Sequence, residues 1–205
     1  QFLGIENLLL LRGDKAKDDR VFMPTPGGHS HTTELISQVN RFNKGLFNDG
    51  TSINHPGVPF EYGVAAYPEK HEEATNMKMD LEWLKEKQDM GASYAVTQLF
   101  YDNKKFFDFI QAAREIGITI PIIPGIKPLA RLSQLTVVPR TFRCDLPEEL
   151  ASEVLKCKTD EDAQHLGIEW GINQCRELYE AGFHNIHFYT VSAADSVREI
   201  VRKLL

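Results

Sequence analysis

Short apolar runs rich in Val, Ile and Leu alternate along this chain with segments whose apolar residues recur at helical spacing. The runs that predict strands are residues 5–11, 60–66, 94–100, 120–126 and 186–191. Helical spacing is found at residues 33–42, 76–90, 106–117, 168–182 and 194–205, and residues 129–165 predict short helices and loops, with Pro139 and Pro147 as breaks. Strands separated by helices form parallel sheets. The alternation therefore predicts an α/β fold of five βα units.

Two α/β architectures fit five such units, an open doubly wound sheet and part of a barrel. A dinucleotide-binding sandwich carries G-x-G-x-x-G after its first strand. Neither this motif nor G-x-x-x-x-G-K-[ST] follows any of the predicted strands. The dinucleotide-binding sandwich is therefore disfavoured.

The composition is that of an ordinary globular domain, with 205 residues, 42% apolar and 25% charged. We expect one domain over residues 1–205. The net charge of -6 argues against a nucleic-acid partner, and no apolar run is long enough to span a membrane. Cys144, Cys157 and Cys175 form no C-x-x-C motif. They predict free thiols in the cytoplasm rather than a disulfide framework or a zinc site.

Ligands of parallel α/β folds bind at the carboxyl ends of the strands. The polar candidates at these ends are Arg12, Gly13, Asp14, Tyr67, Glu69, His71, Gln98, Tyr101, Lys127, Gln134, Tyr189, Thr190 and Ser192. Since five strand ends meet at one edge, we expect these groups to line one pocket. His29 and His31 could bind a metal by their spacing, but a solvated loop is the favoured interpretation and no metal site is predicted.

The helix at 76–90 carries Asp80, Trp83 and Lys87 on one stripe, beside an apolar stripe. An Asp can accept from sugar hydroxyls, a Lys can bind a phosphate, and a Trp can stack on a base. From spacing alone, a solvated ion-paired face is the favoured interpretation and a ligand-binding face the alternative.

Six blocks carry a family resemblance. They are LRGD (11–14), AAYPEKHEEA (65–74), DLEWLKEKQDMGA (80–92), TQLFYD (97–102), IIPGIKP (122–128) and HFYT (187–190). Each lies at a strand end or on the following helix. In this order and spacing, the chain resembles methylenetetrahydrofolate reductase of the bacterial, FAD-dependent type over essentially its whole length.

The resemblance implies a (βα)8 TIM-type barrel of which this chain covers about strands 4 to 8, with FAD at the strand carboxyl ends. It implies reduction of 5,10-methylenetetrahydrofolate to 5-methyltetrahydrofolate, in which NADH or NADPH first reduces the flavin and the folate then enters the same site. It also implies a homo-oligomer.

The family's site residues are expected at matching positions of this sequence. The cofactor-binding positions are Arg12, Gly13, Asp14, Thr32, Tyr67, His71, Ala74, Asp80, Trp83 and Lys87. For the stripe on the helix at 76–90, the resemblance thus favours ligand binding over a solvated face. Asp14 and Gln98 are expected to be catalytic and to contact the folate, and Gln134 to be a second folate contact.

The sequence departs from the family pattern at three positions. One is Leu99, which stands where relatives often have an aromatic residue after the glutamine. Trp83 stands where some relatives have Asn, and Ala193 stands where bacterial relatives have an Arg that pairs with the glutamate tail of the folate. The chain also opens directly on a predicted strand. We therefore expect a preceding portion that carries the family's first three strands and its general acid.

Two other interpretations stay open. One is a flavin barrel of the proline dehydrogenase type, which lacks a pterin site; LRGD and TQLF favour the reductase. The other is a non-catalytic barrel fragment, since an open barrel exposes strand edges.

Overall fold

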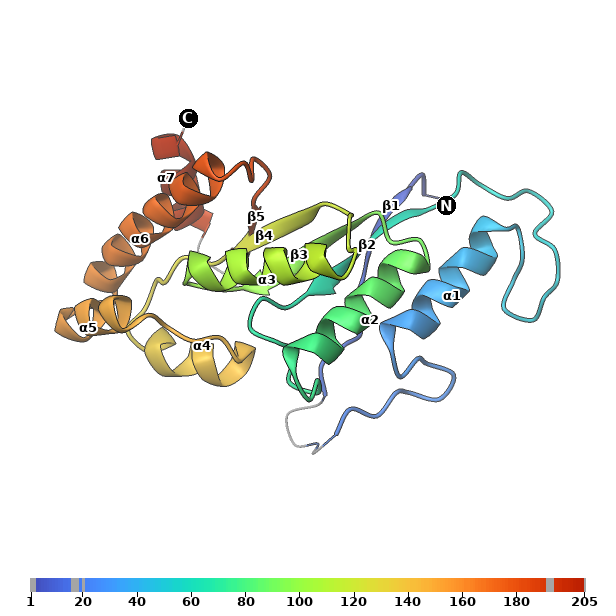
Figure 1. Ribbon diagram of the computed structural model, residues 1–205, viewed down its shortest axis with the longest axis horizontal. Coiled ribbons are helices and arrows are strands. Elements are labelled where there is room, and N and C mark those ends of the chain that lie inside the picture. Colours follow the sequence, from blue (N-terminus) through green and yellow to red (C-terminus); the bar gives the residue numbers. More distant parts are fainter. Residues whose placement is uncertain (1–2, 16–18, 20, 191–193, 205) are drawn as a thin grey trace.

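A parallel sheet of five strands organises the chain (Figure 1). The computed structural model describes residues 3–15, 19, 21–190 and 194–204. The strands are β1 (Asn7–Leu10), β2 (Glu61–Ala66), β3 (Tyr94–Leu99), β4 (Ile122–Ile126) and β5 (His187–Phe188). The helices are α1 (Thr32–Asn43), α2 (Met77–Asp89), α3 (Asn103–Glu115), α4 (Gln134–Phe142), α5 (Glu148–Lys156), α6 (Asp160–Glu180) and α7 (Ala194–Leu204).

The strand order decides between the two candidate architectures. Each strand pairs in parallel with the next one along the chain, in the order β1-β2-β3-β4-β5. A doubly wound sheet reverses its strand order, whereas right-handed crossovers between successive strands place every helix on the same face. The prediction of a segment of a (βα)8 barrel is confirmed.

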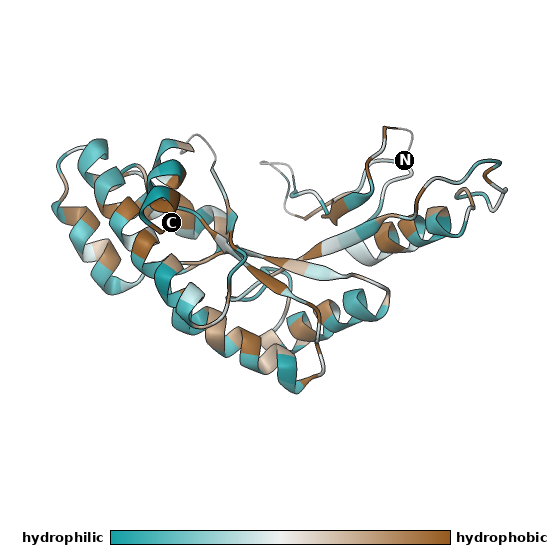
Figure 2. Cartoon of the chain, turned by 90° about the horizontal axis from the view of Figure 1, so that it is seen from above, coloured by the Kyte–Doolittle hydropathy of each residue, from teal (hydrophilic) through white to brown (hydrophobic). Residues whose placement is uncertain are grey.

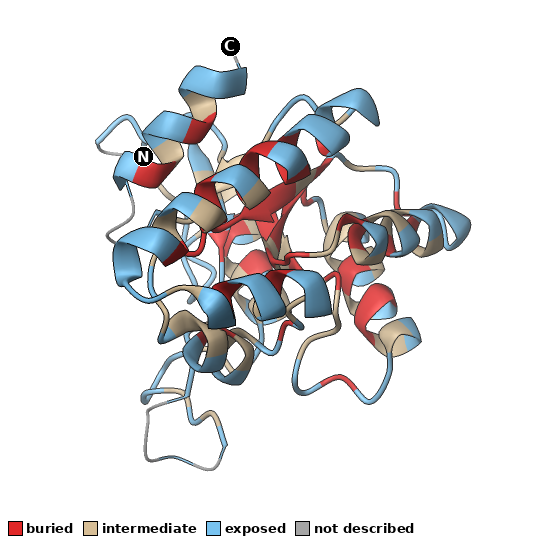
Figure 3. Cartoon of the chain, turned by 90° about the vertical axis from the view of Figure 1, so that its left-hand side faces the viewer, coloured by how far each residue is buried: buried red, intermediate tan, exposed pale blue. Residues whose placement is uncertain are grey.

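The sheet curves, and the helices follow one side of it (Figure 2). Buried residues gather in the strands and on the inward faces of the helices, while the outward faces are exposed (Figure 3). In β1, Leu10 is buried in the core, whereas its neighbour Leu9 is 40% exposed. Successive side chains of a strand point to opposite faces. Within the described residues, the face that carries Leu9 is therefore left open at β1.

The β4 strand is continuous, although Pro124 and Gly125 predicted a break. The ladder with β3 continues through an irregular register between Val96 and Leu99. The Gly125 N–H donates to the hydroxyl of Thr97 at 2.8 Å, and a Cβ on Gly125 would lie 2.3 Å from the Thr97 carbonyl oxygen. Glycine thus permits a close approach of β3 and β4. From the sequence alone, Pro124 and Gly125 predicted a break in the strand instead.

The region 129–165 differs from its prediction in two places. Pro139 lies inside α4 instead of ending it. The α6 helix begins at Asp160, since Thr159 and Asp162 form a capping box there. Residues 160–165, which lay in the predicted region of short helices and loops, are therefore the first turns of the long helix α6.

Candidate ligand site at the ends of the first two strands

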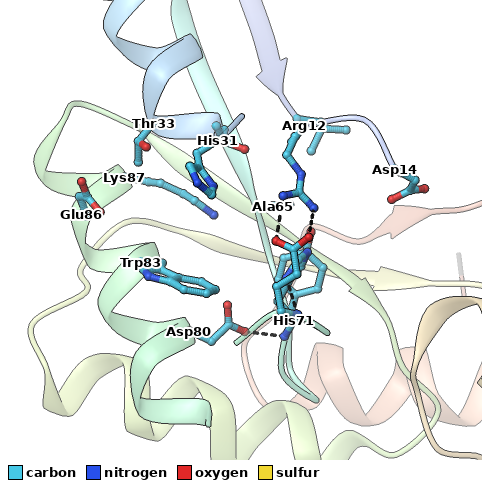
Figure 4. A pocket seen from close by; sticks show the side chains of 14 residues that line it. Arg12, Asp14, His31, Thr33, Ala65, His71, Asp80, Trp83, Glu86 and Lys87 are labelled. Atoms are coloured by element: carbon cyan, nitrogen blue, oxygen red, sulfur yellow. Dashed lines mark hydrogen bonds and ion pairs between the residues drawn. The ribbon is translucent and has the colours of Figure 1, made fainter. Parts of the chain in front are cut away.

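A cavity of about 330 Å³ lies where β1 and β2 end, between the start of α1 and one face of α2 (Figure 4). Eight of the ten positions expected to bind the cofactor line it: Arg12, Asp14, Thr32, Tyr67, His71, Asp80, Trp83 and Lys87. Residues that are 75 positions apart in sequence, such as Arg12 and Lys87, thus share one site. Parallel strands bring this about because their carboxyl ends lie at one edge of the sheet.

The stripe on α2 is not a solvated face. Asn76 caps the helix by accepting from the Met79 N–H, and this sets Asp80, Trp83 and Lys87 toward the cavity (Figure 4). Asp80 is 7% exposed, and its Oδ2 accepts from the backbone N–H of His71 at 2.9 Å. Burial raises the pKa of Asp80 and lowers the pKa of Lys87. The first interpretation from spacing, a solvated ion-paired face, is therefore wrong.

His71 is held as a neutral imidazole. Its Nδ1 accepts from the backbone N–H of Glu73 at 3.2 Å, which leaves the proton on Nε2. Its ring packs edge-on against Tyr67, with centroids 4.7 Å apart. Burial lowers the pKa of His71 and raises the pKa of Tyr67 to about 12. Both side chains thus present hydrogen-bond donors to the cavity at neutral pH.

Glu73 is a site residue that the sequence analysis did not single out. Its carboxylate accepts two hydrogen bonds from the Arg12 guanidinium, at 2.7 and 2.8 Å. The pair joins the end of β1 to the loop after β2, and it raises the pKa of Arg12 and lowers the pKa of Glu73. The guanidinium also lies 4.5 Å from the centre of the Phe22 ring. The available signal was the two glutamates of HEEA, either of which could pair with an Arg at the end of the neighbouring strand.

The amino end of α1 supplies a polar wall. His31, Thr32 and Thr33 line the cavity, and the N-cap residue His31 makes no side-chain capping hydrogen bond. Helix N-termini with free N–H groups attract anions. His29 instead contacts Gln38, with 2.6 Å between Nε2 and Oε1. Among the described residues, no group of three or more His, Cys, Asp and Glu is arranged to hold a metal ion.

Four predicted positions do not line this cavity. Gly13 lies beside it on the chain, and Ala74 is buried, with its carbonyl accepting from Lys70 at 2.6 Å. The Gln98 side chain accepts from the N–H of Leu99 at 3.0 Å. Gln134 Oε1 accepts from the N–H groups of Ala130 and Arg131 before α4, at 2.6 and 3.1 Å. The side-chain oxygen of each glutamine thus accepts hydrogen bonds from backbone N–H groups close to it in sequence.

Two other candidates at the strand ends, Lys127 and Tyr101, are buried, and neither the ammonium nor the hydroxyl has a hydrogen-bond partner among the described residues. Glu69 and Tyr189 have structural partners. Glu69 accepts from Lys105 and from the Asp145 N–H, and Tyr189 donates to the Thr97 carbonyl at 2.8 Å. Ser192 and Ala193, the positions expected to follow the last strand, lie outside the described residues. None of the described helices is long and apolar enough to cross a membrane.

The fold and the cavity define an α/β barrel protein with a polar ligand site at the carboxyl ends of its strands. The methylenetetrahydrofolate reductase family model matches residues 1–205. The chain belongs to the methylenetetrahydrofolate reductase family.

Several relatives of this chain are named methylenetetrahydrofolate reductase. The probable methylenetetrahydrofolate reductase (NADPH) of Caenorhabditis elegans is 39% identical over 204 residues, which cover 98% of this chain and 28% of that protein. Methylenetetrahydrofolate reductase 2 of Saccharomyces cerevisiae is 30% identical over 205 residues, 98% of this chain and 32% of the yeast protein. The 5,10-methylenetetrahydrofolate reductase of Buchnera aphidicola is 31% identical over 193 residues, 94% of this chain and 58% of that protein. The chain spans about a third of the length of the eukaryotic relatives.

Proposed function

We propose that this protein is a flavin-dependent oxidoreductase that reduces 5,10-methylenetetrahydrofolate to 5-methyltetrahydrofolate with NADH or NADPH. Family membership over the whole chain and the names of the relatives support the reaction. The observation that carries the proposal is the buried polar face of α2. Asp80 and Lys87 are desolvated although no described group pairs closely with Lys87. Such groups stay charged at small cost when a ligand completes their contacts.

The residues of the cavity fit FAD by their chemistry. Lys87 and the uncapped start of α1 suit the phosphates, because both offer donors and positive charge. The Asp80 carboxylate suits ribose hydroxyls, and the indole of Trp83 suits stacking on adenine. Arg12, Gly13 and Asp14 are assigned to the side of the flavin ring, with His71 as a donor. A bound FAD would supply the hydride-transfer chemistry that links the nicotinamide to the folate.

Three residues of this chain are proposed to act on the substrates. Asp14 is exposed at the edge of the cavity, where its carboxylate can accept from the amino-pyrimidine of a pterin. Gln98 and Gln134 keep their amide N–H groups for the folate or the nicotinamide, while their oxygens accept from nearby backbone N–H groups.

The runner-up flavin barrel of the proline dehydrogenase type has no support from the family match. A non-catalytic flavin-binding protein is the remaining alternative. We place the protein in the cytoplasm, which its free thiols Cys144, Cys157 and Cys175 support. We also propose a homo-oligomer, which light scattering coupled to size exclusion tests directly.

The test is anaerobic visible spectroscopy of the purified protein. A flavin spectrum that is bleached by NADPH or NADH and restored by methylenetetrahydrofolate supports the proposal. A bound flavin that the nicotinamide bleaches and the folate leaves bleached argues for another acceptor. A protein that stays colourless after incubation with FAD contradicts the assignment of the cavity.

A further inference from the structure

The β3 strand carries an extra residue where it pairs with the end of β4. The ladder pairs before and after this point show that three steps along β3 match two along β4. Thr97 and Gln98 thus share the place of one residue, which is the arrangement of a β-bulge. A bulge changes the direction in which a side chain of its strand points. The direction of the Gln98 side chain therefore depends on what holds the bulge in place.

Thr97 is held from both neighbouring strands on that side of the sheet. It is fully buried, and its hydroxyl accepts from the backbone N–H of Gly125 in β4 at 2.8 Å. Its carbonyl accepts from the phenol of Tyr189, just after β5, at 2.8 Å. Valine has nearly the shape of threonine but offers no acceptor. The threonine hydroxyl is therefore the group that distinguishes this position from an ordinary β-branched core residue.

Tyr189 reaches Thr97 across β4. Its backbone N–H donates to the Ile126 carbonyl at 2.9 Å, which extends the pairing of β5 with β4. Its ring lies close to Gly125, where an added Cβ would be 2.6 Å from a ring carbon. Burial raises the pKa of Tyr189, so the phenol keeps its proton at neutral pH and can donate. The glycine thus gives the phenol access to the bulge.

The bulge also orients the amide of Gln98. The backbone N–H of Leu99, the next residue, donates to Gln98 Oε1 at 3.0 Å. A backbone N–H can only donate, so this bond distinguishes the oxygen of the amide from its nitrogen. The position of the Leu99 N–H is set by the backbone of the bulge. A change at Thr97 should therefore displace the amide of Gln98.

We propose that Thr97 is a positioning residue that acts through Gln98, with Tyr189 as its support. The role rests on the proposed function, in which the Gln98 amide donates to the folate or the nicotinamide. Neither Thr97 nor Tyr189 lines the cavity at the ends of β1 and β2. Substitution of Thr97 should therefore change the binding of substrates and leave the affinity for FAD unaltered.

Hydrogen exchange measured by NMR tests the positioning without substrate. In Gln98→Leu the Leu99 N–H has lost its side-chain acceptor, and its exchange rate sets the scale for a displaced amide. Thr97→Val should approach that rate, about tenfold above the wild type, whereas Thr97→Ser, which keeps the hydroxyl, should stay near the wild type. Amides of β2 report any general loss of stability. A Leu99 N–H that is as protected in Thr97→Val as in the wild type overturns the proposal, whether or not the protein reduces the folate.

Kinetics test whether the positioning serves the substrates. We expect Thr97→Val to raise the KM for methylenetetrahydrofolate about tenfold, the cost of one misplaced hydrogen bond, with a smaller change in kcat. In the Gln98→Leu background the same substitution should add nothing, since both changes act through one amide. A further loss in that background, or an equal effect of Thr119→Val at an exposed threonine before β4, contradicts the role.

Tyr189→Phe decides if circular dichroism shows that Thr97→Val is unfolded. It removes the phenol donor and keeps the ring, so the Leu99 N–H should exchange faster and the KM should rise, each by a smaller factor than in Thr97→Val. Tyr179→Phe, at a tyrosine that is 60% exposed, is the control. An unchanged exchange rate together with an unchanged KM in Tyr189→Phe would then overturn the proposal.

Discussion

The Arg12 guanidinium and the Glu73 carboxylate form two hydrogen bonds, of 2.7 and 2.8 Å, across 61 positions of sequence. They connect β1 to the loop after β2 at the mouth of the cavity. Arg12 is the more buried partner, with 17% of its side chain exposed against 40% for Glu73.

Glu73→Gln should lower the free energy of unfolding by about 1 kcal/mol, the value of a well-formed but partly exposed pair. Because Arg12 lowers the pKa of Glu73 below 4.5, the pair stabilises the fold above that pH. The stabilisation is lost as the pH falls through the lower, folded-state value. Urea unfolding at a series of pH values measures the difference. A deficit in Glu73→Gln that persists in acid, or one matched by the surface control Glu82→Gln, would reject this role.

Lys87→Met should separate stability from cofactor retention. Burial lowers the pKa of Lys87 below 10.5, so folding already disfavours its charge, and a methionine of similar length removes that cost. We expect an unfolding temperature of the apoprotein that is equal or higher, and an affinity for FAD that is about tenfold weaker because one phosphate contact is lost. Lys78→Met, on the exposed side of α2, is the control. Unchanged FAD affinity in Lys87→Met would remove Lys87 from the proposed site.

His71 should make stability fall in mild acid. Its pKa is lowered by burial, so the unfolded chain binds the proton more readily than the folded chain. Stability is therefore lost as the pH falls below 6.5 and until the folded-state pKa is reached. His71→Gln should flatten this slope in urea unfolding, whereas the exposed control His55→Gln should retain it. An NMR titration that gives His71 a pKa at or above 6.5 would disprove the buried neutral imidazole.

Gly167→Ala and Gly171→Ala, on the same helix, should differ sharply. A Cβ at Gly167 would lie 2.1 Å from the Leu129 carbonyl oxygen, which is backbone, so we expect a loss of about 2–3 kcal/mol from overpacking. At Gly171 the nearest atom, at 2.7 Å, is the end of the Ile200 side chain. The helix propensity of alanine, worth about 1 kcal/mol over glycine, should offset the strain there. Thermal unfolding of both variants measures the contrast, and equal losses would contradict the contact at Leu129.

Asp14→Asn should slow the two half-reactions of the proposed mechanism to different extents. If the carboxylate contacts the pterin, folate reduction slows more than oxidation of NADPH or NADH. Stopped-flow absorbance of each half-reaction measures the two rates. Asp19→Asn, at another exposed aspartate, is the control. Equal slowing of both half-reactions would contradict a specific contact between Asp14 and the pterin.

Local sequence pattern located the helices and strands well. The helix expected over 76–90 is α2, Met77–Asp89, and Gly91 lies just beyond it with φ of 113°. The errors have physical reasons. The last strand was expected over 186–191, but β5 spans His187–Phe188, where the ladder with β4 has two pairs. Strand length is set by the partner strand, which apolar pattern does not report.

Within the candidate site, the sequence by itself identified the chemical groups, and the six blocks of the family resemblance carried most of that information. The tertiary structure decided their surroundings. Spacing on α2 could not show that Asp80 is buried and Lys87 half-buried, because burial depends on segments from distant positions, such as α1, which contacts that helix. Nor could residue spacing predict the ion pair between Arg12 and Glu73. Propensity and periodicity are properties of neighbours along the chain, whereas desolvation and ion pairing depend on neighbours in space, which the parallel sheet alone brings together.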